Sequence, residues 1–353
     1  MSLLVNKLPD HKIPYLIRSG EGDRYVFGRQ LATIIANGTS TENLVELVIL
    51  SGGKGDAFPA HKHAKSHEGI YVLHGKLEVV IEDKKYLLTD GNYAFIPAGT
   101  VHGYTMQSHR TQFLSVTSKG EVSSLYSAIG KPYDKFVHPQ KAINELSGED
   151  FAAAANVADV SFLFDHQVDG APQIVENAVV PGDVSPYVLE TGEGVRLVTA
   201  DQLHSVITSQ ANTNSDFITV VTEGPKGEKI PEHYHQKHTE FFFALEGQVT
   251  IWANGEEVVL HPGDFLHCPA NTVHAYRFDS HYTKMVGFLA TGLFEPFFHT
   301  LGDVYEDHIF PAEPYAFRFD RVLANLDKLD LVPLGGPPAK EEPTTDDKET
   351  ING

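Results

Sequence analysis

The chain is organised around residues 55–68, which read GDAFPAHKHAKSHE. They offer two imidazoles two positions apart and a carboxylate five positions after the second. A further segment, residues 91–102, reads GNYAFIPAGTVH and ends on a third imidazole. Three neutral nitrogen ligands and one carboxylate oxygen form a set suited to a divalent transition metal. We therefore predict one metal site, with the ligands His61, His63, Glu68 and His102.

Both segments occur a second time. All four predicted ligands have counterparts 172 positions later, and residues 14–139 align with residues 186–311 without a gap. A repeat of this length at one fixed offset is typical of a tandem duplication. A lone histidine in a strand is more often structural than a ligand, but two copies of a four-ligand spacing are hard to explain as structure alone. The second set of predicted ligands is His233, His235, Glu240 and His274.

Each copy has the residue pattern of a β protein. Short runs rich in Val, Ile, Leu and aromatic residues are separated by Gly, Asp, Asn and Pro, which predicts strands at residues 44–50, 69–73, 76–81 and 93–96. Residues 253–256, ANGE, are a strong hairpin signal in the second copy. Many short strands with regular turns predict an all-β fold of two tandem jelly-roll β-barrels with a few peripheral helices.

The duplication also suggests domain limits. We assign residues 1–145 to a first barrel domain and residues 146–334 to a linker helix with the second barrel domain. The linker helix is expected over residues 147–157, where an acidic first turn precedes an alanine run. Leucines at helical spacing predict another helix over residues 319–329. The tail, residues 335–353, mixes proline with charged and polar residues and is expected to be disordered.

Composition excludes several classes of protein. A formal net charge of −20 argues against a nucleic-acid partner and against anionic membrane surfaces. The sequence has no run of about eighteen apolar residues and no signal-peptide core, so we expect no membrane partner and a cytoplasmic location. Cys268 is the only cysteine, which excludes an intrachain disulfide and sites built from several thiolates.

Strand alternation predicts what surrounds each metal. Side chains two and four positions from an inward ligand on a strand face the same way. The predicted inward residues are Ile70, Val72, Tyr104 and Met106 in the first copy, and Phe242, Ala244, Tyr276 and Phe278 in the second. They could equally be ordinary core, but together they form an apolar and aromatic lining with no Arg or Lys near the metal. The other histidines, including the repeated His109 and His281 and the unrepeated His238, are interpreted as structural.

The ligand spacing resembles the two motifs of the cupin family. Gly-(five)-His-x-His-(four)-Glu-(six)-Gly is followed by Gly-(five)-Pro-x-Gly-(two)-His in the first copy, and the second copy differs at Asn271, which replaces Gly99. Asparagine tolerates left-handed backbone, so the turn is expected to persist. The resemblance implies a bicupin with one divalent transition metal in each domain. We expect iron or manganese, with cobalt, nickel or copper as alternatives.

Longer segments resemble the quercetin 2,3-dioxygenases of the bacterial bicupin type. They include residues 14–22, 51–59, 107–110, 279–285, 292–298 and 308–311. The resemblance implies a dioxygenase that cleaves the heterocyclic ring of a flavonol with O₂ and releases carbon monoxide and a depside. We also expect a homodimer. It also implies that Glu68 and Glu240 serve both as ligands and as general bases. Both sites are expected to bind metal, and the resemblance favours the N-terminal site for catalysis.

Two other classes of function stay open. Oxalate decarboxylases also have two manganese-type sites, but they usually place three residues between the second histidine and the glutamate, whereas this sequence has four in both copies. A different ring-cleaving dioxygenase, or an isomerase acting on a polar substrate, would share the metal sites. A non-catalytic cupin that binds a phenolic ligand is the remaining alternative.

Overall fold

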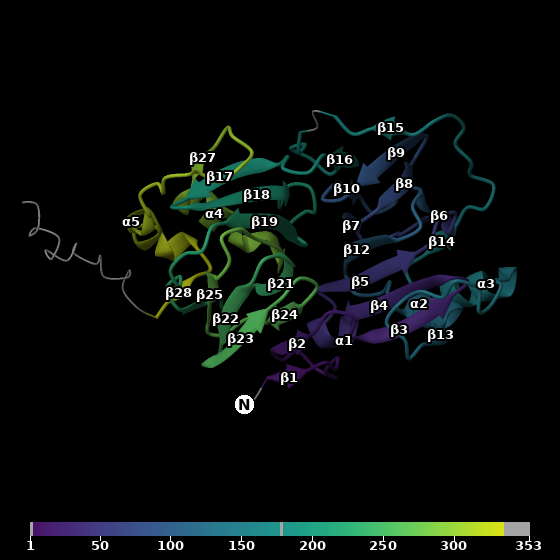
Figure 1. Cartoon of the computed structure of the whole chain (residues 1–353), viewed down its shortest axis with the longest axis horizontal. Coiled ribbons are helices and arrows are strands. Elements are labelled where there is room, and N and C mark those ends of the chain that lie inside the picture. The colour runs from purple at the N-terminus through teal and green to yellow at the C-terminus, as the bar shows by residue number, and fades with distance from the viewer. Residues whose placement is uncertain (1–2, 177–178, 335–353) are drawn as a thin grey trace, which may run out of the picture.

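The computed structural model describes residues 3–176 and 179–334, and it consists of two β-barrels joined along one side (Figure 1). Most of the first barrel is drawn in purple and blue, and most of the second in teal, green and yellow. The predicted all-β fold with two tandem barrels is confirmed. The tail at residues 335–353, predicted to be disordered, lies outside the described residues.

Two sheets form the first barrel. In the order of hydrogen-bonded neighbours, the larger one contains β13 (Lys131–Pro132), β3 (Asp23–Phe27), β4 (Gln30–Ala36), β5 (Val45–Gly52), β12 (Thr111–Ser118), β7 (Glu68–His74), β10 (Tyr93–Ile96) and β16 (Tyr187–Leu189). The smaller one contains β14 (Ser161–Phe162), β6 (Ala57–Lys62), β11 (His102–Met106), β8 (Lys76–Ile81), β9 (Lys84–Thr89) and β15 (Gln173–Ile174). The four strands predicted for this copy all form, within two residues of the expected limits.

The second barrel repeats this plan. Its larger sheet contains β1 (Leu4–Val5), β2 (Tyr15–Ile17), β24 (Phe265–Cys268), β21 (Thr239–Glu246), β26 (Thr283–Ala290), β19 (Ile218–Gly224), β18 (Gln202–Thr208), β17 (Val195–Thr199) and β27 (Asp303–Val304). Its smaller sheet contains β23 (Glu256–Leu260), β22 (Val249–Ala253), β25 (His274–Phe278), β20 (His233–Tyr234) and β28 (Val332–Pro333).

The turns follow the sequence chemistry. Asn254 and Gly255 join β22 to β23 with φ of 50° and 84°, the left-handed pair that a two-residue type I′ hairpin requires. Asn271 has φ of 69°, close to the 88° of Gly99, so the predicted left-handed turn before the last histidine is present in both copies.

Helices lie at the periphery of the barrels. They are α1 (Gly38–Thr41), α2 (Ser124–Ile129), α3 (Gly148–Val157), α4 (Glu295–Leu301) and α5 (Phe319–Leu323), with the 3₁₀ turns η1 (Gly292–Phe294) and η2 (Leu326–Lys328). α3 confirms the predicted linker helix, and Ser147 and Asp150 cap its first turn reciprocally.

The single helix predicted over residues 319–329 is wrong, because the segment divides into α5 and η2. The break lies at Asn325, whose side-chain amide donates to the backbone carbonyl of Arg321. A continuing α-helix would bond that carbonyl to the backbone N–H of Asn325, which donates to Val322 instead. Asparagine therefore competes with the helix for the same acceptor.

The two copies exchange one strand each. β2, from the start of the chain, pairs with β24 in the second barrel, and β16 pairs with β10 in the first. The exchange is symmetric, since Tyr15 donates its hydroxyl hydrogen bond to the carbonyl of Ile35 and Tyr187 donates to that of Ile207. The domain boundary at residue 145 remains a prediction. Both exchanged strands pair with a strand on the other side of this boundary.

A shared core joins the barrels. Phe241 and Phe243 flank Phe242 on β21 and belong to a different cluster of buried residues from it. Both are buried, at 0% and 2% exposure, in one cluster with Tyr71 and Phe95 of the first barrel. The outer faces of the two large sheets therefore pack against each other.

Candidate metal centres and the cavities beside them

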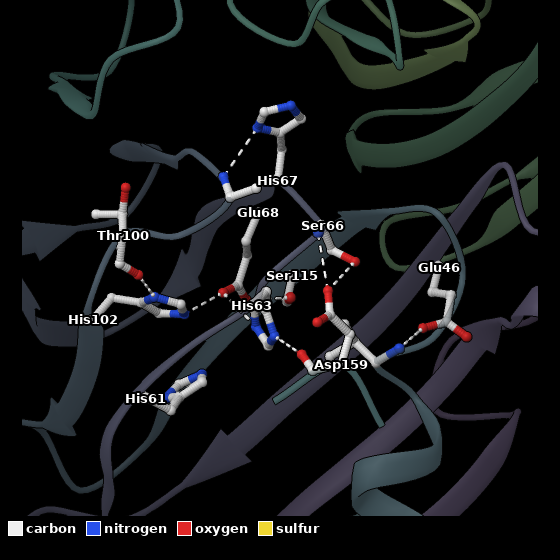
Figure 2. Close-up of polar contacts among 12 residues, drawn as sticks. Glu46, His61, His63, Ser66, His67, Glu68, Thr100, His102, Ser115 and Asp159 are labelled. Atoms are coloured by element: carbon white, nitrogen blue, oxygen red, sulfur yellow. Dashed lines mark hydrogen bonds and ion pairs between the residues drawn. The ribbon is translucent and has the colours of Figure 1, made fainter. Parts of the chain in front are cut away.

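The four residues predicted to bind metal in the first copy converge inside the first barrel (Figure 2). His102 begins β11 and lies directly opposite His61 of β6 in the antiparallel register, while His63 follows the end of β6. Glu68 begins β7 after a short turn. One ligand atom from each residue lies within 4.8 Å of all the others, and all four side chains are buried.

Backbone carbonyls orient the three imidazoles. Nδ1 of His61 lies 2.9 Å from the carbonyl oxygen of Pro59, and Nδ1 of His102 lies 3.0 Å from that of Thr100. Nδ1 of His63 contacts the carbonyl of Asp159 in the same way. A carbonyl can only accept, so each Nδ1 carries a proton and each Nε2 is the nitrogen left to bind a metal. This is the usual arrangement of histidines that bind a metal through Nε2.

The electrostatics keep Glu68 ionised and His61 neutral. Burial alone would raise the pKa of Glu68, but the imidazoles of His102 and His63 beside its carboxylate outweigh burial and hold that pKa well below its usual range. Burial lowers the pKa of His61 far below its ordinary value, and the neighbouring imidazoles lower it further. A carboxylate beside a neutral imidazole is the ionisation state that a metal requires.

Two further residues support this centre, as Figure 2 shows. The Ser115 hydroxyl donates a 2.6 Å hydrogen bond to Oε1 of Glu68. The carboxylate of Asp159 accepts from the backbone N–H groups of Ala64, Lys65 and Ser66 at 2.8–3.0 Å, and so fixes the loop between His63 and Glu68.

The second barrel assembles the same ligands. His233 and His274 face each other across β20 and β25, and their Nδ1 atoms lie 2.9 Å from the carbonyls of Pro231 and Thr272. Oε2 of Glu240 lies 2.9 Å from Nε2 of His274, and Oε1 lies 3.5 Å from Nε2 of His235. Their ligand atoms form two overlapping groups, one with the three histidines and one with His235, His238 and Glu240.

His238, interpreted from the sequence as structural, lies beside this centre. Its Nδ1 lies 2.8 Å from Oδ2 of Asp330, and its Nε2 lies 3.6 Å from Oε1 of Glu240. The first copy has Ser66 at the corresponding position. The only sequence feature that could have identified His238 is this difference between the copies, because it lies outside the repeated spacing.

The donor sets fit a divalent transition metal. Among the described residues, the buried Nε2 atoms of His102, His235, His238 and His274 have no hydrogen-bond partner. Buried polar atoms normally have a hydrogen-bond partner. Nitrogen atoms that lack one and lie close to a carboxylate and to other imidazoles are suited to bind a cation.

The cavities beside the two centres differ greatly in size. The space at the first centre has a volume of about 10 Å³, enough for one water molecule. At the second centre a cavity of about 330 Å³ is lined by His233, Glu240 and His274, and also by Phe317 and Phe319 from the last part of the described chain. Cavities of about 300–1,000 Å³ are typical of small-molecule sites.

Half of the predicted lining residues contact these spaces. Ile70 and Tyr104 line the first, and Phe242 and Tyr276 line the second. The others are buried in the barrel cores and do not line either cavity: Val72, Met106, Ala244 and Phe278.

Aromatic residues fill the first barrel where the second is hollow. The rings of Phe27 and Phe58 meet edge to face with centroids 6.1 Å apart, and Phe58 also stacks on Tyr104. Their counterparts in the second copy are the smaller Thr199 and Ile230, which both line the large cavity. The loss of two phenyl rings makes room there.

One cationic side chain lines the large cavity, in a loop and not at any of the inward strand positions predicted to surround the metal. Lys229 precedes Ile230 in the loop before β20. Its ammonium group lies 2.7 Å from Glu232 and 4.3 Å from the centre of the Trp252 ring, so its charge is already compensated.

Comparisons with known proteins agree with this architecture. The family model of the cupin domain matches residues 48–117 and 220–286, one match in each barrel. Over the residues that the structure describes, no helix is long and apolar enough to cross a membrane.

Two enzymes have similar sequences. The chain is 59% identical over 330 residues to quercetin 2,3-dioxygenase of Bacillus subtilis, covering 94% of this chain and 98% of that protein. It is 33% identical over 142 residues to quercetin 2,3-dioxygenase of Aspergillus japonicus, covering 38% and 40%. Among solved structures, oxalate decarboxylase of Bacillus subtilis matches with a TM-score of 0.52 at 15% identity, covering 81% of this chain and 78% of that one, which shows a shared fold.

Proposed function

Because this chain belongs to the quercetin 2,3-dioxygenase family of two-domain cupins, we propose that it cleaves the heterocyclic ring of a flavonol with O₂, releasing carbon monoxide and a depside. The observation that supports this best is the cavity of about 330 Å³ in the second barrel, whose mostly aromatic and aliphatic walls end on three of the candidate ligands. A flat aromatic molecule with one oxygen directed at the metal fits such a space.

In this proposal each barrel holds one divalent transition metal. The ligands are His61, His63, Glu68 and His102 in the first barrel, and His233, His235, Glu240 and His274 in the second. Iron and manganese are the favoured metals, and cobalt, nickel and copper are alternatives, because this donor set accepts all five. When bound, the metal lowers the pKa of a flavonol hydroxyl that coordinates it.

The protein groups act around that hydroxyl. Glu240 accepts its proton, since the carboxylate lines the cavity and shares the site with the substrate oxygen. His233 and His274, held by backbone carbonyls, keep their orientation while the proton moves. The phenylalanines around the cavity, among them Phe294 and Phe297, exclude water from the reacting centre.

The cavities favour the second barrel as the site that binds a flavonol. The space of about 10 Å³ beside Glu68 admits a water molecule, whereas the cavity beside Glu240 admits a three-ring compound. This differs from the expectation, drawn from family resemblance, that the N-terminal site is the catalytic one. Both assignments are testable with the same pair of variants.

The test uses Glu68→Gln and Glu240→Gln in the full-length, metal-loaded protein, assayed with quercetin in air for loss of flavonol absorbance and for carbon monoxide. We expect Glu240→Gln to lower turnover by about a hundredfold or more and Glu68→Gln to change it little, as loss of a general base predicts. Metal analysis of each variant separates loss of the base from loss of the ion. The opposite ranking would assign catalysis to the first barrel.

Other outcomes would favour another function. Tight quercetin binding without O₂ uptake would favour a phenolic-binding cupin, and turnover of oxalate in place of quercetin would favour decarboxylation. A homodimer and a cytoplasmic location remain predictions from the sequence, for which sedimentation and cell fractionation are the tests.

A further inference from the structure

A polar cluster interrupts the apolar wall of the large cavity. Thr199 at the end of β17, His204 on β18 and Thr222 on β19 all line it. The imidazole lies between the two hydroxyls, with Nε2 2.7 Å from Oγ1 of Thr199 and Nδ1 2.9 Å from Oγ1 of Thr222. All three residues are buried, at 8%, 5% and 5% exposure. We call them the Thr–His–Thr cluster.

The cluster is specific to the second barrel. The corresponding residues of the first copy are Phe27, Ala32 and Leu50, which have no polar side-chain atom. By contrast, the Gln202–Tyr276 hydrogen bond in the same cavity has an equivalent in the first barrel, between Gln30 and Tyr104. Side chains that the fold requires would be expected in both copies. We therefore connect the Thr–His–Thr cluster with the large cavity of the second barrel.

The hydrogen bonding leaves the cluster able to bind another hydroxyl. A neutral imidazole has one N–H donor and one acceptor nitrogen, so one threonine donates to His204 and the other accepts from it. Whichever tautomer is present, the accepting threonine still has a free O–H, and both hydroxyls keep an acceptor lone pair. The cluster can therefore donate to a ligand hydroxyl and accept from it.

The cluster is also uncharged. Burial lowers the pKa of His204 to about 4, so its imidazole is neutral at physiological pH. An uncharged donor–acceptor group inside an apolar cavity suits a phenol better than a carboxylate or an ammonium group. The ring of Phe298 lies 5.4 Å from that of His204 and provides an aromatic surface beside the same point.

We propose that the Thr–His–Thr cluster binds a phenolic hydroxyl on a ring of the flavonol other than the one that reacts, and thereby selects polyhydroxylated flavonols. This rests on the proposed function, since it assumes that a flavonol occupies the cavity with its 3-hydroxyl at the candidate metal ligands. One cavity contains both the ligand side chains and the cluster, so a single molecule can contact both. The inference assigns specificity to residues that the metal site does not include.

The experiment compares quercetin with 3-hydroxyflavone, which has the reacting hydroxyl and no other. Binding is measured by titration of metal-loaded protein without O₂, and kcat/KM is measured in air. The test variant is Thr199→Val/Thr222→Val, which keeps the side-chain volume and removes both hydroxyls. The control is Thr219→Val, on the same strand as Thr222 and fully buried, but not part of the cavity wall.

We expect the double variant to weaken quercetin binding and kcat/KM by about tenfold, the effect of a lost hydrogen bond or two, with 3-hydroxyflavone unchanged. Thr219→Val should leave the ratio between the two ligands as in the wild type. Equal losses for both ligands, or an unchanged ratio in the double variant, would overturn the inference. His204→Phe is a second variant with the same expected change in ratio.

The proposed function is judged separately, on the wild-type protein. If the wild-type protein converts both flavonols and the double variant keeps the wild-type ratio between them, only the role of the cluster is refuted. Wild-type protein that binds flavonols without converting them refutes the dioxygenase activity, and the binding ratio still decides the role of the cluster. Absence of flavonol binding refutes both.

Discussion

The two candidate metal centres keep the same ligands but differ in what holds the carboxylate. Glu68 receives a hydrogen bond from Ser115, whereas the position that corresponds to Ser115 in the second copy is Gly287. Glu240 faces His238 instead. The copies have therefore diverged around the carboxylate while the contacts from Nδ1 to backbone carbonyls are preserved. Such partners orient a ligand and tune its basicity, so the two sites are not expected to behave alike.

Ser115→Ala tests the support of Glu68. The variant removes a hydrogen bond to an ionised carboxylate, and loss of such a partner weakens metal binding by about 10- to 100-fold. We expect this loss at the first centre alone, measured by competition with a chelator in a His233→Ala/His235→Ala background.

Gly287→Ser is the matched variant in the second barrel. A Cβ atom at Gly287 would come no closer than 3.6 Å to the nearest atoms outside its immediate chain neighbours, so the backbone there has room for a Cβ. We expect it to supply Glu240 with a hydroxyl donor and to strengthen metal binding at the second centre, in a His61→Ala/His63→Ala background. Equal metal affinity in Ser115→Ala and its parent would show that the hydroxyl does not hold the carboxylate.

The residues that could be predicted are those whose spacing repeats. All eight candidate ligands follow from two copies of one pattern, and the structure brings four of them together inside each barrel, in one group in the first and in two overlapping groups in the second. His204 and His238 could not be found that way, because each occurs in one copy only and owes its place to residues on other strands or segments, such as Thr222 and Asp330. Comparison of non-identical positions between the copies would have singled them out.

At the scale of elements, an aspartate that follows each aligned copy holds the ligand loop. Asp330 accepts from the backbone N–H groups of Gln236, Lys237 and His238 at 2.9–3.0 Å, and its carbonyl oxygen receives Nδ1 of His235. Asp159 does the same in the first barrel. The segments that carry these aspartates continue into β28 and β14, which pair with β20 and β6.

Asp330→Ala is expected to loosen the loop of the second centre. It leaves three backbone donors and the His238 ring without their acceptor, and we expect a loss of about 1–3 kcal/mol in the free energy of unfolding. Chelator competition should show weaker metal binding at the second centre and unchanged binding at the first. Asp159→Ala is the matched variant and should give the reverse. Loss at both centres in either variant would contradict the assignment.

The exchanged strand β2 is fixed by a partly buried ion pair. Nη1 of Arg18 lies 2.6 Å from Oδ2 of Asp264, and the other carboxylate oxygen accepts from the backbone N–H of Ser19 at 2.8 Å. The Asp264 side chain is only 4% exposed, whereas that of Arg18 is 38% exposed. Loss of the guanidinium therefore leaves a carboxylate with little water around it.

Arg18→Ala is expected to lower the free energy of unfolding by about 1–3 kcal/mol, less than for a fully buried pair because the arginine is partly hydrated. Chemical denaturation measures it. The control is Lys12→Ala, which removes the more exposed ion pair with Glu42 and should cost about 0–1 kcal/mol. Equal losses would indicate that Arg18 contributes no more than a surface ion pair.

Strand positions could be predicted because they depend on local composition and turns. The partners of β2 and β16 could not, because nothing in a short run such as Tyr15–Ile17 states which of two similar sheets it joins. The prediction of one helix over residues 319–329 was wrong for a related reason, since the spacing of leucines gives no information about the competing hydrogen bond of Asn325.

For the whole molecule, the shared core and the exchanged strands make the two barrels interdependent. Phe95 and Phe241, from different barrels, belong to one buried cluster, and each large sheet contains a strand from the other copy. A barrel on its own would expose a large apolar face and an unpaired strand edge, both of which promote aggregation.

This interdependence predicts fragment complementation. A cut between Gly170 and Ala171, where both residues are exposed, places β2 in the first fragment and β16 in the second. Each barrel then lacks a strand that only the other fragment supplies. We expect either fragment alone to aggregate, and the two co-expressed fragments to purify as a 1:1 complex with metal in both barrels. The measurements are size-exclusion chromatography with light scattering, and metal analysis.

A control pair of fragments that lacks residues 1–19 has no β2 and should associate more weakly, because the β24 edge is then unpaired. Either fragment folding alone as a soluble, metal-binding monomer would show that the barrels are independent domains and that the shared core contributes little to their stability.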